Sequence, residues 1–447
     1  MTERRWRFRL ARLGYNLVIH LLIPLVLLHF LWRSRREPGY RQHIGERLAL
    51  GPPPAQRPDL WIHAVSLGEM RVAGTLVQAL ADGHPALQIL LTTVTPAGRA
   101  EAERMRSAGL PVEIRYLPLD APVLLRRFIR RTRPGALVLV ETELWPNLLR
   151  QTRLAGLSAV LVNARLSPRL RATYHRFRLL YAPLLAALEW VAAQGPGDAD
   201  HFRELGARRV EVTGNLKFDL PEVPVTPELS RDRFAAERLW LAGSTHPGEE
   251  ALLLDVHRRL QAAHPESRVQ LLLAPRHPAR APELMALSRS AGFSVVARSG
   301  IAAAPTAADV IVLDTLGELA GLYGVADAAF VGGSLVTHGG QNPLEPIAAG
   351  CPAVIGPDSR NFADMVELLR NAGAIVQVAD ADGLLLALER LIGDPEAGCA
   401  QVEKARQTIR ANRGATARTL SLLDPLLPAP RESAGHRNPD RRQVHSP

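Results

Sequence analysis

The stretch ALVLVETELWPNLLRQTRLAGLSAVLVNAR, residues 136–165, decides the fold of this chain. It begins with a continuous apolar run, ALVLV, and ends with a second one, AVLV, and the segment between them has helical character. Strands that are apolar throughout are typical of parallel sheets buried on both faces, and a helix usually connects two such strands. The stretch therefore predicts a strand–helix–strand unit.

The same alternation of strand-like and helical segments continues toward both ends of the chain. Further strand-like runs begin at Leu60, Leu87, Ile114 and Gly206 in the first half, and at Leu239, Val269, Phe293, Ala308, Ala326, Pro352 and Ala374 in the second half. Strands that alternate with helices in this way predict a parallel sheet in each half. We expect an α/β protein with two doubly wound, Rossmann-like domains that face each other across a cleft.

The length of 447 residues also favours two domains. The proline-rich segment DLPEVPVTPELS, residues 219–230, separates the two halves and is predicted to be a linker or hinge. We place the first domain at residues 37–218 and the second, with the terminal helices, at residues 231–427. Residues 428–447 lack apolar periodicity and are predicted to be disordered.

An apolar segment without charged residues, Leu13–Trp32, lies near the N-terminus between two groups of arginines. Its length is close to what a membrane span needs, although His20, Pro24 and His29 weaken that interpretation. Basic flanks suit anionic lipid headgroups both for a spanning helix and for a helix in the interface, and a buried N-terminal helix is the third possibility. We predict a membrane anchor at residues 1–36, with the bulk of the protein in the cytoplasm.

The composition narrows the class of partner. The formal net charge of +10 favours an anionic partner, such as nucleic acid, acidic lipid or a phosphorylated sugar. Aromatic residues make up only 5% and form no stacking platform with arginines, so we predict no nucleic-acid partner. Cys351 and Cys399 form no CxxC motif and are predicted to be reduced, as in a cytoplasmic protein.

Several common sites are absent from the sequence. It contains no GxxxxGK[ST] motif and no convincing GxGxxG fingerprint, which disfavours ATP hydrolysis and ordinary dehydrogenase chemistry. It contains no HExxH motif and no Cys/His metal constellation either. We expect no cofactor and a mechanism independent of metal, unless carboxylates recruit an ion.

Charged residues follow several predicted strands, at the edge where open α/β sheets bind ligands. In the first half, Glu69 begins a helix after the strand at Leu60, Glu141 directly follows the ALVLV run, and Lys217 lies near the linker. A carboxylate at a helix N-terminus often only compensates the helix dipole, and a lysine near a linker is usually a solvated charge. Their position at one predicted cleft nevertheless favours a catalytic site.

A possible nucleotide site lies in the second half, in the stretch VGGSLVTHGGQNPLEPIAAGCPAVIGPDSRNF, residues 331–362. A strand is predicted to end at the pair Gly332 and Gly333, where backbone without Cβ atoms can approach a ligand. A helix is predicted from Asn342 to Ala349, with Glu345 in its first turn. Helix N-terminal amides suit a phosphate, and a nearby carboxylate suits sugar hydroxyls.

The sequence resembles the 3-deoxy-D-manno-octulosonic acid (Kdo) transferases, because ten motifs occur here in the order seen in that family. They are HAVSLGE, TPAGR, ETELWPN, NARLS, TGNLKFD, STHPGEE, APRHP, DTLGEL, VGGSLV and GGQNPLEP, and the resemblance covers residues 13–425. It implies an inverting glycosyltransferase of the GT-B fold that uses CMP-Kdo to glycosylate a lipid A precursor, lipid IVA. It further implies a role in lipopolysaccharide inner-core assembly, at the cytoplasmic face of the inner membrane of a Gram-negative bacterium.

The resemblance also implies roles for individual residues. It makes Glu69 the general base and assigns Glu141 and Lys217 to transition-state stabilisation. It assigns nucleotide binding to Pro275, Arg276, Leu316, Gly317, Glu318, Asn342, Pro343, Leu344 and Glu345. From the local sequence we add Ser244, Thr245, Gly332 and Gly333 to that site. The family usually has histidine where this chain has Gln341, which puts any role of that side chain in doubt.

Three alternative functions are considered. A soluble sugar-nucleotide epimerase has no need of the apolar N-terminal segment, and a lipid A disaccharide synthase-like transferase fits the ETELWPN and NLKFD motifs less well. A membrane scaffold without activity has no need to keep Glu69, Glu141 and Lys217. The sequence leaves open the number of Kdo residues transferred, the oligomeric state, and whether the anchor spans the membrane or lies in the interface.

Overall fold

The chain forms two compact units in the computed structural model, which describes residues 2–35, 37–219, 230–301 and 305–428. The first unit comprises residues 1–219 and 413–447, and the second comprises residues 220–412. Most of the predicted linker (220–229) and the predicted tail (429–447) lie outside the described residues.

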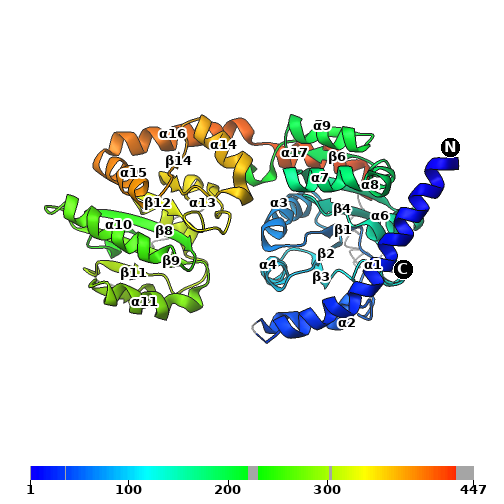
Figure 1. Cartoon of the computed structure of the whole chain (residues 1–447), viewed down its shortest axis with the longest axis horizontal. Coiled ribbons are helices and arrows are strands. Elements are labelled where there is room, and N and C mark those ends of the chain that lie inside the picture. Colours follow the sequence, from blue (N-terminus) through cyan, green and yellow to red (C-terminus); the bar gives the residue numbers. More distant parts are fainter. Residues whose placement is uncertain (1, 36, 220–229, 302–304, 429–447) are drawn as a thin grey trace, which may run out of the picture. The chain divides into compact units, whose positions relative to one another are not determined.

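The first unit is built on a sheet of seven parallel strands in the order β3-β2-β1-β4-β5-β6-β7 (Figure 1). The strands are β1 (Leu60–His63), β2 (Ile89–Thr93), β3 (Val112–Tyr116), β4 (Ala136–Val140), β5 (Ser158–Ala164), β6 (Val191–Ala193) and β7 (Val210–Val212). Every residue of β1, β2 and β4 is buried, as their apolar sequences predict. The strand order reverses direction between β1 and β4, so the carboxyl ends of these two strands flank the switch point of the sheet.

Helices cover both faces of this sheet. One face packs against α3 (Leu67–Gly83), α4 (Pro96–Ser107) and α17 (Ala415–Leu423). The other packs against α5 (Pro122–Thr132), α6 (Pro146–Leu154), α8 (Arg178–Leu185) and α9 (Pro196–Leu205), with α7 (Pro168–Arg176) between α6 and α8 in the sequence. A short 3₁₀ helix, η2 (Leu216–Asp219), follows β7 and contacts α3 and α17.

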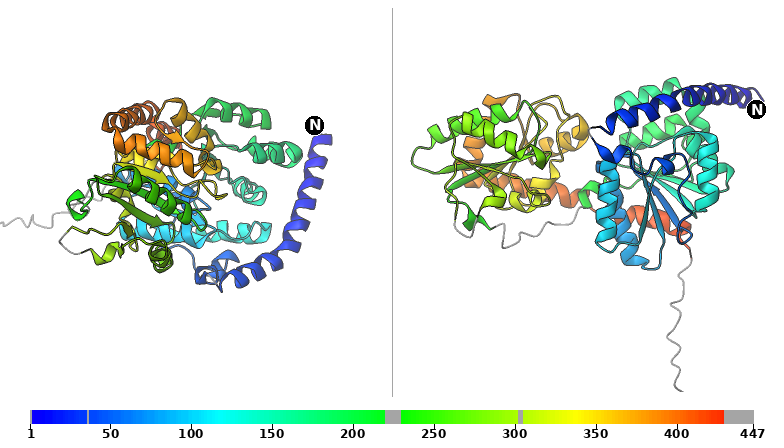
Figure 2. Two further views of the ribbon diagram at one scale, coloured as in Figure 1. Left: turned by 60° about the vertical axis from the view of Figure 1, so that its left-hand side comes forward. Right: turned by 90° about the horizontal axis from the view of Figure 1, so that it is seen from below.

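The N-terminal segment forms one long helix, α1 (Thr2–Arg33), followed by η1 (Pro38–Tyr40) and α2 (Ile44–Arg47). Figure 1 shows α1 along the outside of the first unit, where it packs against α8, and Figure 2 shows it from two further sides. Within Trp6–Arg33, a window of 18 residues has a mean hydropathy of 1.9, so this helix is long and apolar enough for a membrane span. Phe8 packs against the core, whereas Leu17, Leu21 and Leu25 are exposed.

The second unit contains another sheet of seven parallel strands, in the order β10-β11-β9-β8-β12-β13-β14. They are β8 (Arg238–Thr245), β9 (Val269–Pro275), β10 (Val295–Ala297), β11 (Val310–Val312), β12 (Ala328–Val331), β13 (Ala353–Ile355) and β14 (Val376–Gln377). β8 and β12 flank the switch point here. The helices of this unit are α10 (Glu250–Ala263), α11 (Ala281–Ser290), α12 (Leu319–Tyr323), α13 (Leu344–Ala348), α14 (Ala363–Asn371), α15 (Ala381–Gly393) and α16 (Pro395–Asn412).

The predicted α/β class with two doubly wound domains is confirmed by these two sheets. The C-terminal boundary differs from the prediction, which assigned all the terminal helices to the second domain. The last of them, α17, packs against the first sheet, and its N-terminal amides at Gly414 and Thr416 donate to the Asp219 carboxylate at 2.7 and 2.6 Å. Its apolar face therefore completes the first core rather than the second.

Candidate functional site

The first predicted site residue, Glu69, lies in the first turn of α3, directly after β1. Ser66 caps this helix by accepting a hydrogen bond from the Glu69 amide at 3.3 Å. The Glu69 carboxylate in turn accepts the Val65 amide at 2.6 Å and the Ser66 hydroxyl at 3.1 Å. This reciprocal capping fixes the carboxylate at the carboxyl end of the central strand.

Glu141 lies across the switch point, one residue beyond β4, and pairs with Lys217. Its Oε1 atom is 2.8 Å from Lys217 Nζ, which reaches it from η2. Glu141 has a φ of 63°, a left-handed conformation that costs a residue with a side chain of order 1 kcal/mol or more. The structure thus brings two of the three predicted catalytic residues into direct contact.

Asn163 supports this pair from the neighbouring strand β5. It also has a positive φ, 52°, and its Oδ1 atom accepts the Leu216 amide at 3.0 Å, which fixes the start of η2 beside Glu141. Its Nδ2 atom lies 3.5 Å from Glu141 Oε1. The sequence analysis assigned no role to Asn163, although it lies in the NARLS motif at a strand end.

A third carboxylate, Glu143, belongs to this cluster and was not predicted to act in it. It accepts a hydrogen bond from the indole N–H of Trp145. Burial, together with weaker repulsion from Glu143 and Glu141, raises the pKa of Glu69 to about 8. Burial also raises the pKa of Glu143, with a smaller contribution from Glu141. Glu69 is therefore a carboxyl group that changes its charge near neutral pH.

In the second unit, the predicted ligand residues at the ends of β8 and β12 are in contact. Gly332 donates its amide to the Gly243 carbonyl at 2.8 Å, and a Cβ at Gly332 would come within 2.6 Å of the Ser244 carbonyl oxygen. Ser244 has a positive φ of 56°. Only glycine allows the two strand ends to approach so closely, which agrees with the prediction of bare backbone at this point.

The end of β9 joins the same edge. The Arg276 amide donates to the Thr245 carbonyl at 2.9 Å, and Pro275 is the last residue of β9. The Thr245 hydroxyl donates to the Glu250 carboxylate at 3.2 Å, which is also paired with Arg280 at 2.6 Å. The structure therefore brings together six predicted residues of this unit, namely Ser244, Thr245, Pro275, Arg276, Gly332 and Gly333.

Two stacked histidines and Gln341 lie beside them. His246 stacks on His338 with ring centroids 4.4 Å apart, and its Nε2 atom is 3.0 Å from the side-chain nitrogen of Gln341. Burial, together with weaker electrostatic repulsion from His338 and Arg276, lowers the pKa of His246 to about 4. His246 is thus neutral at pH 7, so its Nε2 atom can accept the hydrogen bond that the Gln341 amide donates.

Glu249 connects the end of β12 to α10. The carboxylate is fully buried, and its Oε1 atom accepts the Gly333 amide at 2.6 Å and the His246 amide at 2.7 Å. Burial raises its pKa to about 7 in spite of these two bonds. The sequence analysis missed Glu249, although it lies in the STHPGEE motif.

The predicted segment 342–345 begins α13. Asn342 Oδ1 accepts the Leu344 amide at 3.1 Å, Pro343 is the residue before the helix, and Glu345 lies in the first turn. Tyr323 connects Glu345 to the end of β8: Glu345 helps raise the pKa of the buried Tyr323, whose hydroxyl lies where a Cβ of Gly243 would overlap it. The segment therefore lies near the same switch point.

The segment 316–318 follows β11, two strands away from β8. Leu316 is 85% exposed and Gly317 has a φ of 90°. Glu318 accepts the Thr315 hydroxyl at 2.7 Å and pairs with Arg298 at 3.4 Å. The described contacts do not join this segment to the cluster around Gly332.

Two further features bear on ligands. Among the described residues, no group of three or more His, Cys, Asp or Glu side chains is placed to hold a metal ion.

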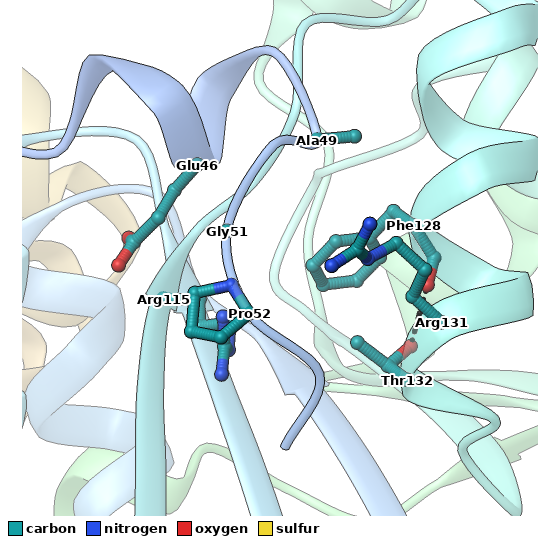
Figure 3. Close-up of a pocket in the computed structure, with 8 residues that line it drawn as sticks. All are labelled: Glu46, Ala49, Gly51, Pro52, Arg115, Phe128, Arg131 and Thr132. Atoms are coloured by element: carbon teal, nitrogen blue, oxygen red, sulfur yellow. Dashed lines mark hydrogen bonds between the residues drawn. The ribbon is translucent and has the colours of Figure 1, made fainter.

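A separate pocket in the first unit is shown in Figure 3 and is lined by Glu46, Ala49, Gly51, Pro52, Arg115, Phe128, Arg131 and Thr132. Its Arg115 is already paired with Glu113, and its lining contains no predicted site residue, so we assign it no ligand.

Comparison with known proteins gives matches over nearly the whole chain. A sequence model of the family 3-Deoxy-D-manno-octulosonic-acid transferase (kdotransferase) matches residues 42–220. The 3-deoxy-D-manno-octulosonic acid transferase of Haemophilus influenzae is 36% identical over 435 residues, which cover 94% of this chain and 99% of that protein. The enzyme of the same name from Bordetella pertussis is 37% identical over 426 residues, which cover 92% and 99%.

Solved structures share the fold at low sequence identity. The UDP-GlcNAc 2-epimerase from Neisseria meningitidis, bound to UDP-GlcNAc, has a TM-score of 0.55 and 12% identity, and the match covers 82% of this chain and 99% of that chain. MurG of Acinetobacter baumannii has a TM-score of 0.50 and 16% identity, with coverage of 82% and 100%. These likenesses establish the fold alone.

Proposed function

The chain belongs to the 3-deoxy-D-manno-octulosonic acid (Kdo) transferase family, and from this premise we propose that it transfers Kdo from CMP-Kdo to a lipid A precursor, lipid IVA. The reaction contributes to the inner core of lipopolysaccharide. The observation that carries the proposal is the cluster of Glu69, Glu141 and Lys217 at the switch point of the first sheet.

Glu69 is the proposed general base. A hydroxyl of the acceptor is a weak nucleophile at neutral pH, and a carboxylate within hydrogen-bond reach activates it by accepting its proton as the new bond forms. Burial and two neighbouring carboxylates raise the pKa of Glu69 to about 8, which makes it a stronger base than an ordinary glutamate. The bonds from Val65 and Ser66 hold its position while it takes up the proton.

Lys217 and Glu141 are proposed to stabilise the transition state together. The Kdo donor carries a carboxylate next to its anomeric carbon, and the Lys217 ammonium supplies a positive charge that can pair with it. Glu141 fixes that ammonium through the 2.8 Å ion pair, and its own charge suits the positive charge that builds up on the sugar.

The second unit is proposed to bind the CMP portion of the donor. The positive charge of the Arg276 guanidinium can offset the charge of a single phosphate, so we propose transfer without a metal. Asn342 and Glu345 at the start of α13 are the proposed contacts of the nucleoside, with Leu316, Gly317 and Glu318 completing the site.

The proposed step is a direct displacement. The acceptor oxygen forms a bond to the anomeric carbon of Kdo, its proton passes to Glu69, and the bond between that carbon and the phosphate oxygen breaks. CMP leaves with the electron pair, and the anomeric configuration inverts. Removal of water from the donor favours transfer over hydrolysis.

The exposed apolar surface of α1 supports membrane association. We propose that α1 holds the enzyme at an anionic membrane surface where its lipid acceptor resides, on the cytoplasmic face of the inner membrane. The arginines at positions 4, 5, 7, 9 and 12 supply the basic flank.

Mass spectrometry of the reaction products tests the function directly. Purified full-length protein in detergent is incubated with CMP-Kdo and a tetraacyl lipid A precursor, and UDP-GlcNAc replaces CMP-Kdo in a parallel reaction. We expect an increase in acceptor mass by one or more Kdo residues with CMP-Kdo only. Turnover of UDP-GlcNAc without Kdo transfer would contradict the proposal and indicate an epimerase or a disaccharide synthase-like enzyme.

A further inference from the structure

α1 makes a specific polar contact with the first unit in addition to its apolar ones. The Tyr15 hydroxyl donates a hydrogen bond to Asp120 Oδ2 at 2.7 Å. Asp120 is only 3% exposed and lies in the loop between β3 and α5. A helix that only inserts apolar side chains into a membrane does not require a hydrogen bond to a buried carboxylate.

Asp120 holds the N-terminus of α6. Its Oδ1 atom accepts the Leu148 amide at 2.8 Å and its Oδ2 atom accepts the Asn147 amide at 3.1 Å. The Asn147 side chain also donates to the Asp120 carbonyl at 2.7 Å. The residue before α6, Trp145, provides no side-chain cap, so Asp120 supplies the capping oxygens from a distant part of the chain.

The segment that Asp120 fixes in this way is the one that carries the site carboxylates. Residues 141–145 connect β4 to α6 and include Glu141 and Glu143. The Tyr174 hydroxyl adds a further restraint on this segment by donating to the Thr142 carbonyl at 3.1 Å. Tyr174 packs against Tyr181 of α8, with ring centroids 4.4 Å apart, and α8 is the helix on which α1 lies.

The Asp120 carboxylate depends on these donors. Tyr15, Asn147 and Leu148 are all neutral, and burial raises the pKa of Asp120 to about 6, so the group is largely ionised at neutral pH with no ion pair among its described contacts. Loss of one donor to a buried carboxylate is costly, because the acceptor loses both its partner and its water. The Tyr15 hydroxyl therefore affects how firmly α6 and the preceding segment are held.

We propose that Tyr15 and Asp120 are positioning residues for transfer, so that the seating of α1 on the first unit sets the position of Glu141 and Glu143. This inference rests on the proposed function, because it assigns a consequence to the placement of the site carboxylates. It predicts that transfer depends on Tyr15 even in detergent, where no membrane has to be bound.

The test compares Tyr15→Phe with a matched control on the same helix, Leu17→Ala. Leu17 is 64% exposed, so its truncation removes lipid-facing surface without touching Asp120. In detergent we expect Tyr15→Phe to lower kcat about tenfold, the effect of losing one hydrogen bond to a charged group, with the KM for CMP-Kdo unchanged. Leu17→Ala should keep kcat within about twofold in detergent and instead weaken sedimentation with anionic vesicles.

Asp120→Asn provides a second variant and a double-mutant cycle. If Tyr15 acts through Asp120, adding Tyr15→Phe to Asp120→Asn should lower kcat little further than Asp120→Asn alone. The pH profile of kcat adds a measurement that a merely destabilised protein does not change: retreat of Glu143 and Glu141 from Glu69 should move the apparent pKa of the base to lower pH. Additive losses, or an unshifted profile with normal kcat, would overturn the proposal.

Hydrogen exchange separates failure of this inference from failure of the proposed function. The amides of residues 141–148 should exchange faster in Tyr15→Phe than in the wild type and in Leu17→Ala, with no substrate present. If the wild type shows no Kdo transfer but exchange still responds to Tyr15, the proposed function fails and the positioning role stands. If the wild type transfers Kdo and the Tyr15→Phe substitution changes neither kcat nor the exchange of residues 141–148, only the positioning role is refuted.

Discussion

Glu69 in the first unit and Glu249 in the second occupy corresponding places in two similar sheets. Each follows the central strand that flanks the switch point, and each lies at the N-terminus of the next helix. Each accepts a hydrogen bond from a backbone amide of the preceding loop. Burial is the main reason that the pKa is raised in both, to about 8 for Glu69 and about 7 for Glu249.

The surroundings of the two glutamates differ, and the difference assigns a catalytic role to Glu69 and a structural role to Glu249. Glu69 is only partly buried and faces two further carboxylates, so a substrate hydroxyl can reach it and its affinity for a proton is increased. Glu249 has no exposed surface and uses Oε1 to bind the amides of His246 and Gly333. A raised pKa at a helix N-terminus is therefore not sufficient evidence of a base, and access to the carboxylate decides the matter.

The largest expected effect is that of Glu69→Gln. An amide cannot accept the proton of the acceptor hydroxyl, so the rate of Kdo transfer should fall by about 10²- to 10⁴-fold. CMP binding, measured by calorimetry, should be unchanged, because we assign it to the second unit. Glu204→Gln is the control, since Glu204 is an exposed carboxylate of the same unit. Near-normal turnover of Glu69→Gln would remove Glu69 from the mechanism.

For Glu249, we expect substitution by glutamine to have little effect and substitution by alanine to have a large one. Glu249→Gln keeps an acceptor oxygen for both backbone amides, so we expect nearly normal CMP binding and stability. Glu249→Ala leaves two buried amides without an acceptor, which should lower the free energy of unfolding by about 1–3 kcal/mol and weaken CMP binding about tenfold. Calorimetry and denaturant unfolding measure both. A strong loss of transfer in Glu249→Gln with CMP binding intact would show that the two glutamates do not differ as proposed.

The positions of Glu69 and Glu141 could be predicted because they depend on local sequence. Apolar runs fix the strands, and the residue after a buried strand must lie at the ligand-binding edge of the sheet. The same reasoning placed Gly332 and Gly333 beside the end of β8, where the structure leaves no room for a Cβ.

Features that depend on contacts distant in the sequence could not be predicted. α17 returns to the first unit because its apolar face completes that core, and nothing within the helix indicates which sheet it covers. The role of Glu143 follows from its burial near Glu69, and that of Asp120 from the approach of Tyr15, 105 positions away in the chain. Such contacts arise from tertiary packing and leave no periodic signal.

An intermediate effect is expected from Glu143→Gln, which tests the electrostatic part of the comparison. The base must be ionised to accept a proton, so transfer should increase as the pH rises toward the Glu69 pKa of about 8. Removing the Glu143 charge should move this increase to lower pH by about one unit, because repulsion is a smaller cause of the raised pKa than burial. Rates measured from pH 5.5 to pH 9 test the shift, and a profile identical to that of the wild type would refute the repulsion.

Unfolding experiments test the same raised pKa through stability. The folded-state pKa of Glu69 lies above its ordinary value of 4.5, so the fold favours the protonated form. Its contribution to stability is complete below pH 4.5 and is lost as the pH rises through about 8. Glu69→Gln removes this loss, so it should gain stability relative to the wild type between pH 5 and pH 9. A difference independent of pH would contradict the raised pKa.

The smallest effect is expected from Gln341→His, which restores the residue usual in the family. The Gln341 amide lies 3.0 Å from the Nε2 atom of His246, and that ring is neutral at pH 7 because its pKa is lowered to about 4. A neutral imidazole at position 341 can donate one N–H to the same atom, so the hydrogen bond is kept and CMP affinity should change by less than about threefold. Gln341→Leu, which cannot donate, is the matched comparison and should weaken CMP binding more. If histidine lowers the affinity as much as leucine does, position 341 contacts the ligand through the amide itself rather than supporting His246.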